Sequence, residues 1–204
     1  MKIFLIIATI IIIVLLIFQI YITMATGKSE TQSYKVIRKD NQFEIRYYPA
    51  AVIAQISSTS KSYRDLGYSG FGKLAKYIFG GNSDKKQIAM TSPVHMDIGD
   101  SISTMAFIMP AEYSKDDLPI PDNAEIDIQT KEAEYVAAIT FGGFASAADI
   151  DKHKAILQSQ LTEKGITYYG NFRFLGYNPP YQIFGRRNEV IVSVDEAQFL
   201  NNNH

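Results

Sequence analysis

The chain has 204 residues and is 47% hydrophobic, which is enough for one sizeable core or two small ones and excludes an intrinsically disordered chain. Its net charge of −1, with Lys and Arg spread along the sequence, gives no basic patch for nucleic acid. The absence of cysteine excludes disulfides, a thiolate nucleophile and Cys-ligated metals, and the presence of only three histidines argues against a histidine-based zinc site.

The N-terminal segment is strongly apolar. Ile3 to Phe18 is an unbroken apolar run except for Thr9, and apolar residues continue past Gln19 to Met24. A helix that crosses the hydrocarbon core needs about 20 such residues, whereas the apolar region of a signal peptide has about 7–15. We therefore expect residues 1–25 to be an uncleaved single-pass anchor, in preference to a cleaved signal segment, and residues 26–33 to be a polar linker.

The charges that flank this segment indicate its orientation. Lys2 and the α-amino group flank one end, whereas Lys28, partly offset by Glu30, flanks the other. This difference predicts a cytoplasmic N-terminus and an extracytoplasmic domain, held at the membrane by one span.

The first part of the soluble region predicts strands followed by a helix. Residues 34–38, 43–48 and 51–57 alternate as strands, with turn residues between the first two and Pro49 after the second. After a polar stretch that reaches Gly70, the segment FGKLAKYIFGGN predicts a helix, because its apolar residues recur at helical spacing. Gly80 and Gly81 are typical of a helix C-terminus.

Residues 87–98, QIAMTSPVHMDI, predict the central strand. Five of the six residues on one face are apolar, whereas His95 falls with Thr91 and Asp97 on the other, mostly polar face. Pro93 cannot donate to a strand ladder, so the strand lies at an edge or is bulged at this point. A bulge would turn His95 inward.

The pattern of strands and a helix then occurs a second time. A strand at 102–109 completes the first pattern, and the second consists of strands at 125–130, 135–141, 172–177 and 189–194, with a helix that begins at Ser146 and ends at Gly165. We infer an α+β domain over residues 34–195, made of two duplicated ββαββ halves that share one sheet or barrel with both helices packed on it. Residues 196–204 are expected to form a flexible tail.

Five runs, KYIFGGN, QIAMTSPV, FGGF, GYNPP and GRRNEV, occur in this order and together resemble the SOUL/haem-binding protein family. The resemblance covers roughly Ser33 to Val194. It implies a distorted antiparallel β-barrel with two helices, built from a duplicated half. It also implies non-covalent binding of haem or another tetrapyrrole in an open apolar groove beside the first of these helices, without enzymatic activity. A membrane anchor departs from the soluble members of the family.

The resemblance also indicates which residues would hold the ligand. Phe71, Leu74, Tyr77 and Ile78 would line the groove, and one or both of Lys73 and Lys76 would lie near the haem propionates. A lysine at the rim of a groove could pair with two carboxylates. The alternative for the same residues is a core stripe beside an ordinary solvated helix face.

His95 is the candidate axial ligand of the iron, because imidazole suits haem iron. The alternative is a hydrogen-bonded or solvated histidine on the outer face of its strand, and strand parity favours this alternative. Arg186 to Glu189 are interpreted as structural, with an Arg–Glu pair that connects the last strand to the GYNPP loop.

These observations predict a membrane-tethered tetrapyrrole-binding protein that buffers, transports or senses haem. The alternative is a non-enzymatic interaction module that binds a hydrophobic peptide or a partner helix. The sequence has no nucleophile-elbow, phosphate-loop or zinc-protease motif, so no enzyme class is favoured. Haem or porphyrin and the lipid bilayer are the expected partners, nucleic acid is not, and the sequence names no protein partner.

Overall fold

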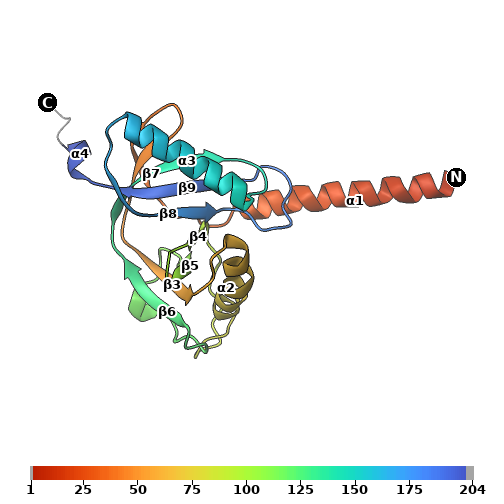
Figure 1. The fold of residues 1–204 in the computed structure, drawn as a ribbon. Helices are drawn as coiled ribbons and strands as arrows, with labels where there is room; N and C mark the ends of the chain where they lie inside the picture. Colours follow the sequence, from red (N-terminus) through yellow and green to blue (C-terminus); the bar gives the residue numbers. More distant parts are fainter. Residues whose placement is uncertain (1, 201–204) are drawn as a thin grey trace.

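The computed structural model of the protein describes residues 2–200. In chain order the elements are α1 (Lys2–Gly27), β1 (Lys35–Lys39), β2 (Glu44–Tyr48), β3 (Ala51–Ser58), α2 (Tyr63–Ile78), β4 (Val94–Asp97), β5 (Ser103–Ile108), the 3₁₀ helix η1 (Lys115–Asp117), β6 (Ile126–Lys131), β7 (Glu134–Phe141), α3 (Ala147–Glu163), β8 (Tyr168–Gly176), β9 (Asn188–Val194) and α4 (Ala197–Leu200). Figure 1 shows α1 projecting away from the domain that the other elements form.

The nine strands form one antiparallel sheet in the order β1-β2-β7-β9-β8-β4-β5-β3-β6. This confirms the α+β class and the shared sheet. The expected distorted antiparallel β-barrel is a curled half-barrel, because β1 and β6 are its two edges. Only two residues separate β2 from β3, and these strands pair with β7 and β6, so the four strands make one long ribbon.

The order strand, strand, helix, strand, strand occurs twice, as β2-β3-α2-β4-β5 and as β6-β7-α3-β8-β9. In space the two sets exchange one strand: β6 joins β3, β5 and β4 of the first set, and β2 joins β7, β9 and β8 of the second. The two sets meet where β4 pairs with β8. The element order is therefore as expected, and the duplication that would explain it stays a prediction.

Helix α2 begins at Tyr63, well before the predicted start at Phe71. Ser62 is its N-cap, and its side chain accepts a hydrogen bond from the Asp65 N–H. Gly70 lies inside the helix, where an added Cβ would come within 2.5 Å of the Ile56 side chain. The glycine therefore lets α2 approach the sheet closely, although glycine in a polar stretch indicates a loop when only the sequence is read.

Helix α3 matches its prediction more closely. The Ser146 hydroxyl accepts from the Asp149 N–H at 3.2 Å, and the Asp149 carboxylate accepts from the Ser146 N–H at 3.0 Å. These reciprocal bonds satisfy two donors that the first turn would otherwise leave without partners.

The central strand is shorter than predicted. Only Val94–Asp97 pair in the sheet, and Pro93, which follows a cis peptide bond, lies just before the strand. Gln87 and Ser92 form isolated bridges to Phe79 and Thr31 instead. β4 pairs with β5 in an unbroken register, so His95 and Met96 point to opposite faces of the sheet.

The two faces of the sheet are covered differently. One face buries the large side chains of α2 and α3 in two clusters, which contain Leu74 and Leu157 respectively. The opposite face, here called the helix-free face, carries two smaller clusters, which contain Tyr177 and Ala106. The expected linker partly covers this face, because Gln32 N–H donates to the Ser92 carbonyl and Ser92 N–H donates to the Glu30 carbonyl.

Candidate functional site

A cavity of about 430 Å³ lies beside α2. Its lining comes from Gly72, Lys73, Lys76 and Tyr77 on the helix and from Asp122, Asn123 and Ile126 on the segment that leads into β6. The cavity is flanked by the same helix turn that the resemblance assigns to a ligand groove. It is more polar than expected, because two lysines, an aspartate and an asparagine lie on it.

The apolar residues that were expected to line the groove take two different positions. Leu74 and Ile78 are fully buried in the core between α2 and the sheet. Tyr77 is also buried, and its hydroxyl donates to the Pro119 carbonyl at 3.0 Å, but its side chain reaches the cavity wall. Phe71 is partly exposed, and its ring lies edge-on against Phe107, with the two ring centres 5.2 Å apart.

The two lysines of α2 differ in their partners. Lys73 Nζ lies 2.7 Å from the Glu125 carboxylate. Hydrogen bonds from Lys73 and from Asn123 lower the pKa of Glu125. Lys76 is exposed, and within residues 2–200 it forms no ion pair. An anionic group at this rim would therefore meet Lys76 directly but would have to compete with Glu125 for Lys73.

The structure separates His95 from these residues. Met96 packs in the α2 cluster, so its neighbour His95 lies on the helix-free face. His95 is buried, and its Nε2 is 2.8 Å from the Gln32 Oε1, to which the ring N–H donates. Burial lowers the pKa of His95 well below its usual value, and the nearby charges of Lys131 and Arg173 lower the pKa further. The expected ligand set is thus divided between two faces of one sheet.

A second cavity, of about 240 Å³, lies against His95 on the helix-free face, and sequence reasoning missed it. Its charged lining residues are Asp97, Lys131 and Arg173. Arg173 donates two hydrogen bonds to the Glu134 carboxylate, at 2.8 and 2.7 Å. Burial would raise the pKa of Glu134, but Arg173 and Lys131 outweigh it and lower the pKa to about 2. These residues come from four strands, so no local sequence motif connects them.

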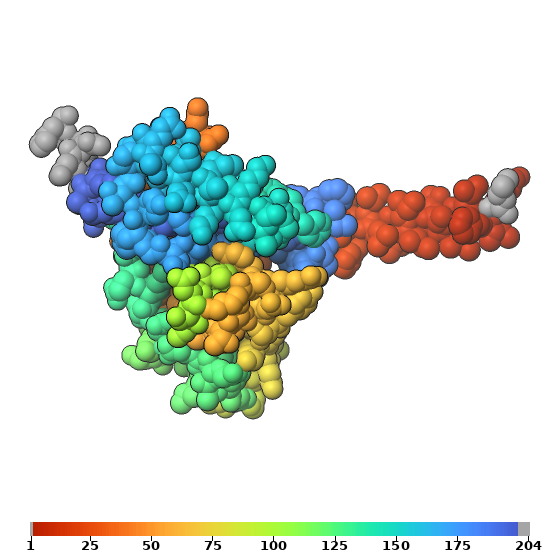
Figure 2. Space-filling view, in the orientation of Figure 1, coloured from red at the N-terminus to blue at the C-terminus, as the bar shows by residue number. Residues whose placement is uncertain are grey.

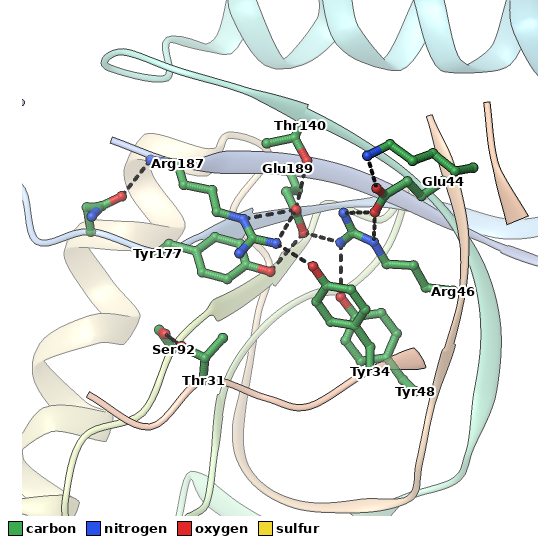
Figure 3. A network of polar contacts seen from close by, with 12 residues as sticks. Thr31, Tyr34, Glu44, Arg46, Tyr48, Ser92, Thr140, Tyr177, Arg187 and Glu189 are labelled. Atoms are coloured by element: carbon green, nitrogen blue, oxygen red, sulfur yellow. Dashed lines mark hydrogen bonds and ion pairs between the residues drawn. The ribbon is translucent and has the colours of Figure 1, made fainter. Parts of the chain in front are cut away.

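The helix-free face also carries a buried network of charges around Glu189 (Figure 3). The Glu189 side chain is fully buried and accepts hydrogen bonds from Arg46 at 2.9 Å, Arg187 at 2.7 Å and Tyr177 at 2.8 Å. Burial would raise the pKa of Glu189, but hydrogen bonds and charge from Arg46 and Arg187 outweigh it and lower the pKa. Glu189 therefore stays ionised between two guanidinium groups.

This network connects elements that are distant in the sequence. Arg187 N–H donates to the Asn178 side chain at 2.7 Å, and the Arg187 guanidinium lies 4.1 Å from the centre of the Tyr177 ring. Its Nη2 also donates to the Tyr34 hydroxyl at 3.0 Å. These contacts confirm the interpretation that an Arg–Glu pair connects the last strand to the GYNPP loop. The role is structural, because the polar groups satisfy one another.

The donor atoms on these surfaces suit the binding of a ligand with carboxylates and apolar surface. Within residues 2–200 no three His, Asp or Glu side chains are grouped so as to hold a metal ion. The α2 cavity instead has at its rim the ammonium group of Lys76, which is unpaired in the described part of the chain, and the apolar residues Tyr77 and Ile126 are among those that line it.

Known proteins are similar to this chain along most of its length. Residues 29–193 match the SOUL heme-binding protein family. Heme-binding protein 1 of Xenopus laevis is 30% identical over 176 residues, which cover 80% of this chain and 92% of that protein. Heme-binding protein 1 of Bos taurus is 31% identical over the same length, and heme-binding protein 2 of Homo sapiens is 31% identical over 156 residues, covering 72% of this chain and 76% of the relative.

Solved structures show a similar fold at much lower identity. The C-terminal domain of EcmrR aligns with a TM-score of 0.60 at 8% identity, covering 76% of this chain and 97% of that domain. A hydrolase from Listeria innocua aligns with a TM-score of 0.56 at 7% identity, covering 78% of this chain and 94% of that protein. At such identities the likeness concerns the fold alone.

Proposed function

The chain belongs to the SOUL heme-binding protein family, and from this we propose that it binds haem or another tetrapyrrole in the α2 cavity while α1 tethers it to a membrane. The family match over residues 29–193 carries the proposal. Relatives named heme-binding proteins match 80% of the chain, and they match almost their own full length. The protein would buffer, transport or sense the ligand close to the bilayer.

The residues beside α2 fit such a ligand. An added Cβ on Gly72 would meet no atom within 4 Å, so space is left open at the cavity wall. Lys76 can pair with a propionate. Tyr68 and Phe71 on the same helix, and Phe79 at its C-cap, expose apolar surface that a macrocycle would cover. At about 25 cal/mol per Å², burial of a porphyrin face would supply most of the affinity.

The proposal does not use His95. A bond from its Nε2 to iron would require the loss of the hydrogen bond to Gln32, on the face of the sheet away from α2. Haem, when bound, would supply the chemistry of its iron, and the chain's own residues would bind and orient the ring. Lys73 and Lys76 would orient the propionates, and Tyr77 would form part of the wall.

The tether is supported by the properties of α1. It is the one helix within residues 2–200 that is long and apolar enough to cross a membrane, and only 6% of its most apolar stretch is buried against the domain. The flanking charges favour a cytoplasmic N-terminus with the domain on the other side.

A hemin titration tests the ligand. We expect a Soret band that saturates near one equivalent of hemin for the wild-type chain. Gly72→Leu should abolish or greatly weaken this band, because leucine would fill the open space at the cavity wall. It should not weaken the fold, since glycine inside a helix costs roughly 0.5–1 kcal/mol relative to other residues.

The matched control is Ser69→Leu, which adds the same side chain to an exposed position of α2 outside the cavity. If Gly72→Leu and Ser69→Leu bind hemin like the wild type, the ligand lies elsewhere. If the wild type binds no hemin, the second candidate function gains support. This candidate is the binding of a hydrophobic peptide, and the exposed Tyr68 of α2 and Phe79 at its C-cap favour it.

A further inference from the structure

Four large apolar side chains are exposed where the domain meets α1. Tyr181, Ile183 and Phe184 are 56%, 53% and 59% exposed in the loop between β8 and β9. Phe144, in the loop between β7 and α3, is 58% exposed. We call these four residues the apolar collar. Figure 2 shows the blue β8–β9 loop lying against the base of the red helix α1.

The side chain of Gln19 in α1 forms hydrogen bonds with the backbone of this loop. The side-chain amide of Gln19 donates to the Tyr181 carbonyl at 3.0 Å, and the Ile183 N–H donates to the Gln19 Oε1 at 3.0 Å. Gln19 is the buried residue of α1, within an otherwise apolar helix. In lipid, an amide without hydrogen-bond partners is strongly unfavourable, and the loop supplies both partners.

Arg186 connects the rest of the collar. It donates to the carbonyls of Pro179 and Gln182, both at 2.7 Å, and to the Gly143 carbonyl at 3.3 Å. Its guanidinium lies 4.4 Å from the centre of the Phe144 ring. The two loops therefore form one surface, and this surface is fixed at the level of Gln19 on α1.

The length of α1 sets the depth of that level in a bilayer. The apolar run Ile3 to Phe18 has 16 residues. At about 1.5 Å per residue it spans about 24 Å, which is less than the roughly 30 Å of a hydrocarbon core. The remaining length of the span must come from the next turns of α1, which expose Ile20, Tyr21 and Met24. These turns can lie in the hydrocarbon core only if Gln19 lies inside its edge.

We infer that the apolar collar enters the lipid bilayer around α1 and forms a second membrane contact of the domain, an inference that rests on the proposed tether. The surface is continuous with the exposed apolar surface of α1, so one bilayer covers both. Tyr181 is suited to the boundary between acyl chains and headgroups, where its ring is buried and its hydroxyl stays hydrated, and the other three side chains are wholly apolar and suited to the acyl chains. The domain would then be held in one orientation on the membrane rather than swing on a free linker.

The chain contains no tryptophan, so one introduced tryptophan reports on its own surroundings. The experiment uses the full chain carrying Phe184→Trp, reconstituted in phosphatidylcholine vesicles with or without lipid brominated on the acyl chains. We expect the emission of this tryptophan to be shifted to shorter wavelength and to be quenched by the brominated lipid. Flotation of the same vesicles shows how much protein stays with them.

Tyr169→Trp is the matched control. Tyr169 is 57% exposed, but it lies at the opposite end of β8 from the loop, about 23 Å away at roughly 3.3 Å per residue. Its emission should stay that of a hydrated tryptophan and should not be quenched. If both variants stay bound to the vesicles and the tryptophan of each is hydrated and unquenched, the proposed collar contact is wrong and the proposed tether still holds. Protein that fails to float with the vesicles would overturn the tether and the collar together.

Discussion

His95 shows how the environment of one side chain depends on what covers its side of the sheet. Strand parity correctly places it away from the core under α2. That side is not solvated, however, because Gln32 and the surrounding strands bury it. Lys131, Arg173, Glu134 and Asp97 are the charged and titratable groups around it. The imidazole is therefore a neutral structural group in a charged pocket.

This environment predicts a contribution of His95 to the pH dependence of stability. The pKa of His95 is lowered by burial in the folded state and is about 6.5 when unfolded, so protonation favours unfolding. The stabilisation that the neutral His95 contributes is complete above about pH 6.5 and is lost as the pH falls below that value. His95→Gln should flatten the slope of the unfolding free energy between pH 7 and 5, by at most about 1.4 kcal/mol per pH unit.

Urea unfolding of a chain that begins at Ser29, at a series of pH values, measures this slope. His153→Gln is the control, because His153 lies on α3, where its ring stacks on Phe141 away from the charged pocket. Equal slopes for the wild type and His95→Gln would show that His95 takes up its proton equally well in the folded state.

At the scale of elements, α2 and α3 occupy equivalent places in the two strand-helix sets but are fixed differently. α3 begins with reciprocal capping bonds that a sequence motif predicts. α2 is capped by the Ser62 side chain alone and depends on Gly70 to approach β3. Both helices nevertheless bury a fully covered leucine, Leu74 in α2 and Leu157 in α3.

We therefore expect Leu157→Ala to lower the free energy of unfolding by about 2–5 kcal/mol, because it leaves a cavity under α3. Gln158→Ala, at the next and exposed position, should change it by less than about 0.5 kcal/mol. Denaturant unfolding of the chain that begins at Ser29 measures both. A loss below about 1 kcal/mol for Leu157→Ala would contradict the tight packing of α3 on the sheet.

At the scale of the whole molecule, the protein consists of a curled sheet domain and a long apolar helix that projects from it (Figure 1). The domain contacts α1 through Gln19. After α1, Glu30 and Gln32 form backbone hydrogen bonds with Ser92, in the segment before β4. The region 26–33 is therefore not simply a free spacer, because its second half is bonded to the domain.

The tether predicts how the protein partitions. The full chain should remain in the membrane fraction after high-salt and carbonate washing, since a span of apolar residues is not released by either. A chain that begins at Ser29 should be soluble and folded, because it keeps the bonds of Glu30 and Gln32 to Ser92. Recovery of a mature protein that begins near Thr26 would instead indicate cleavage of the segment.

Features that depend on residues close together in the chain could be predicted before the structure was known. The apolar run at the N-terminus, the period of two in β2 and β3, and the Ser146–Asp149 cap each involve residues close together in the chain. The family follows from motifs that keep their order and spacing, and the family match confirms it. The order of elements follows from apolar periodicity, and the structure has the same order.

Contacts between residues from distant parts of the chain became clear only from the folded protein. It placed His95 and Lys76 on opposite faces, brought Arg46 to Glu189, and joined Gln19 to the loop before β9. Each of these outcomes depends on the order of the strands in the sheet. The alternation of side chains along one strand defines the two faces of the sheet, but it does not show which segments cover either face. The curl of the sheet and the segments that cross it supply that cover, and so they decide which polar groups are buried and which surface stays open.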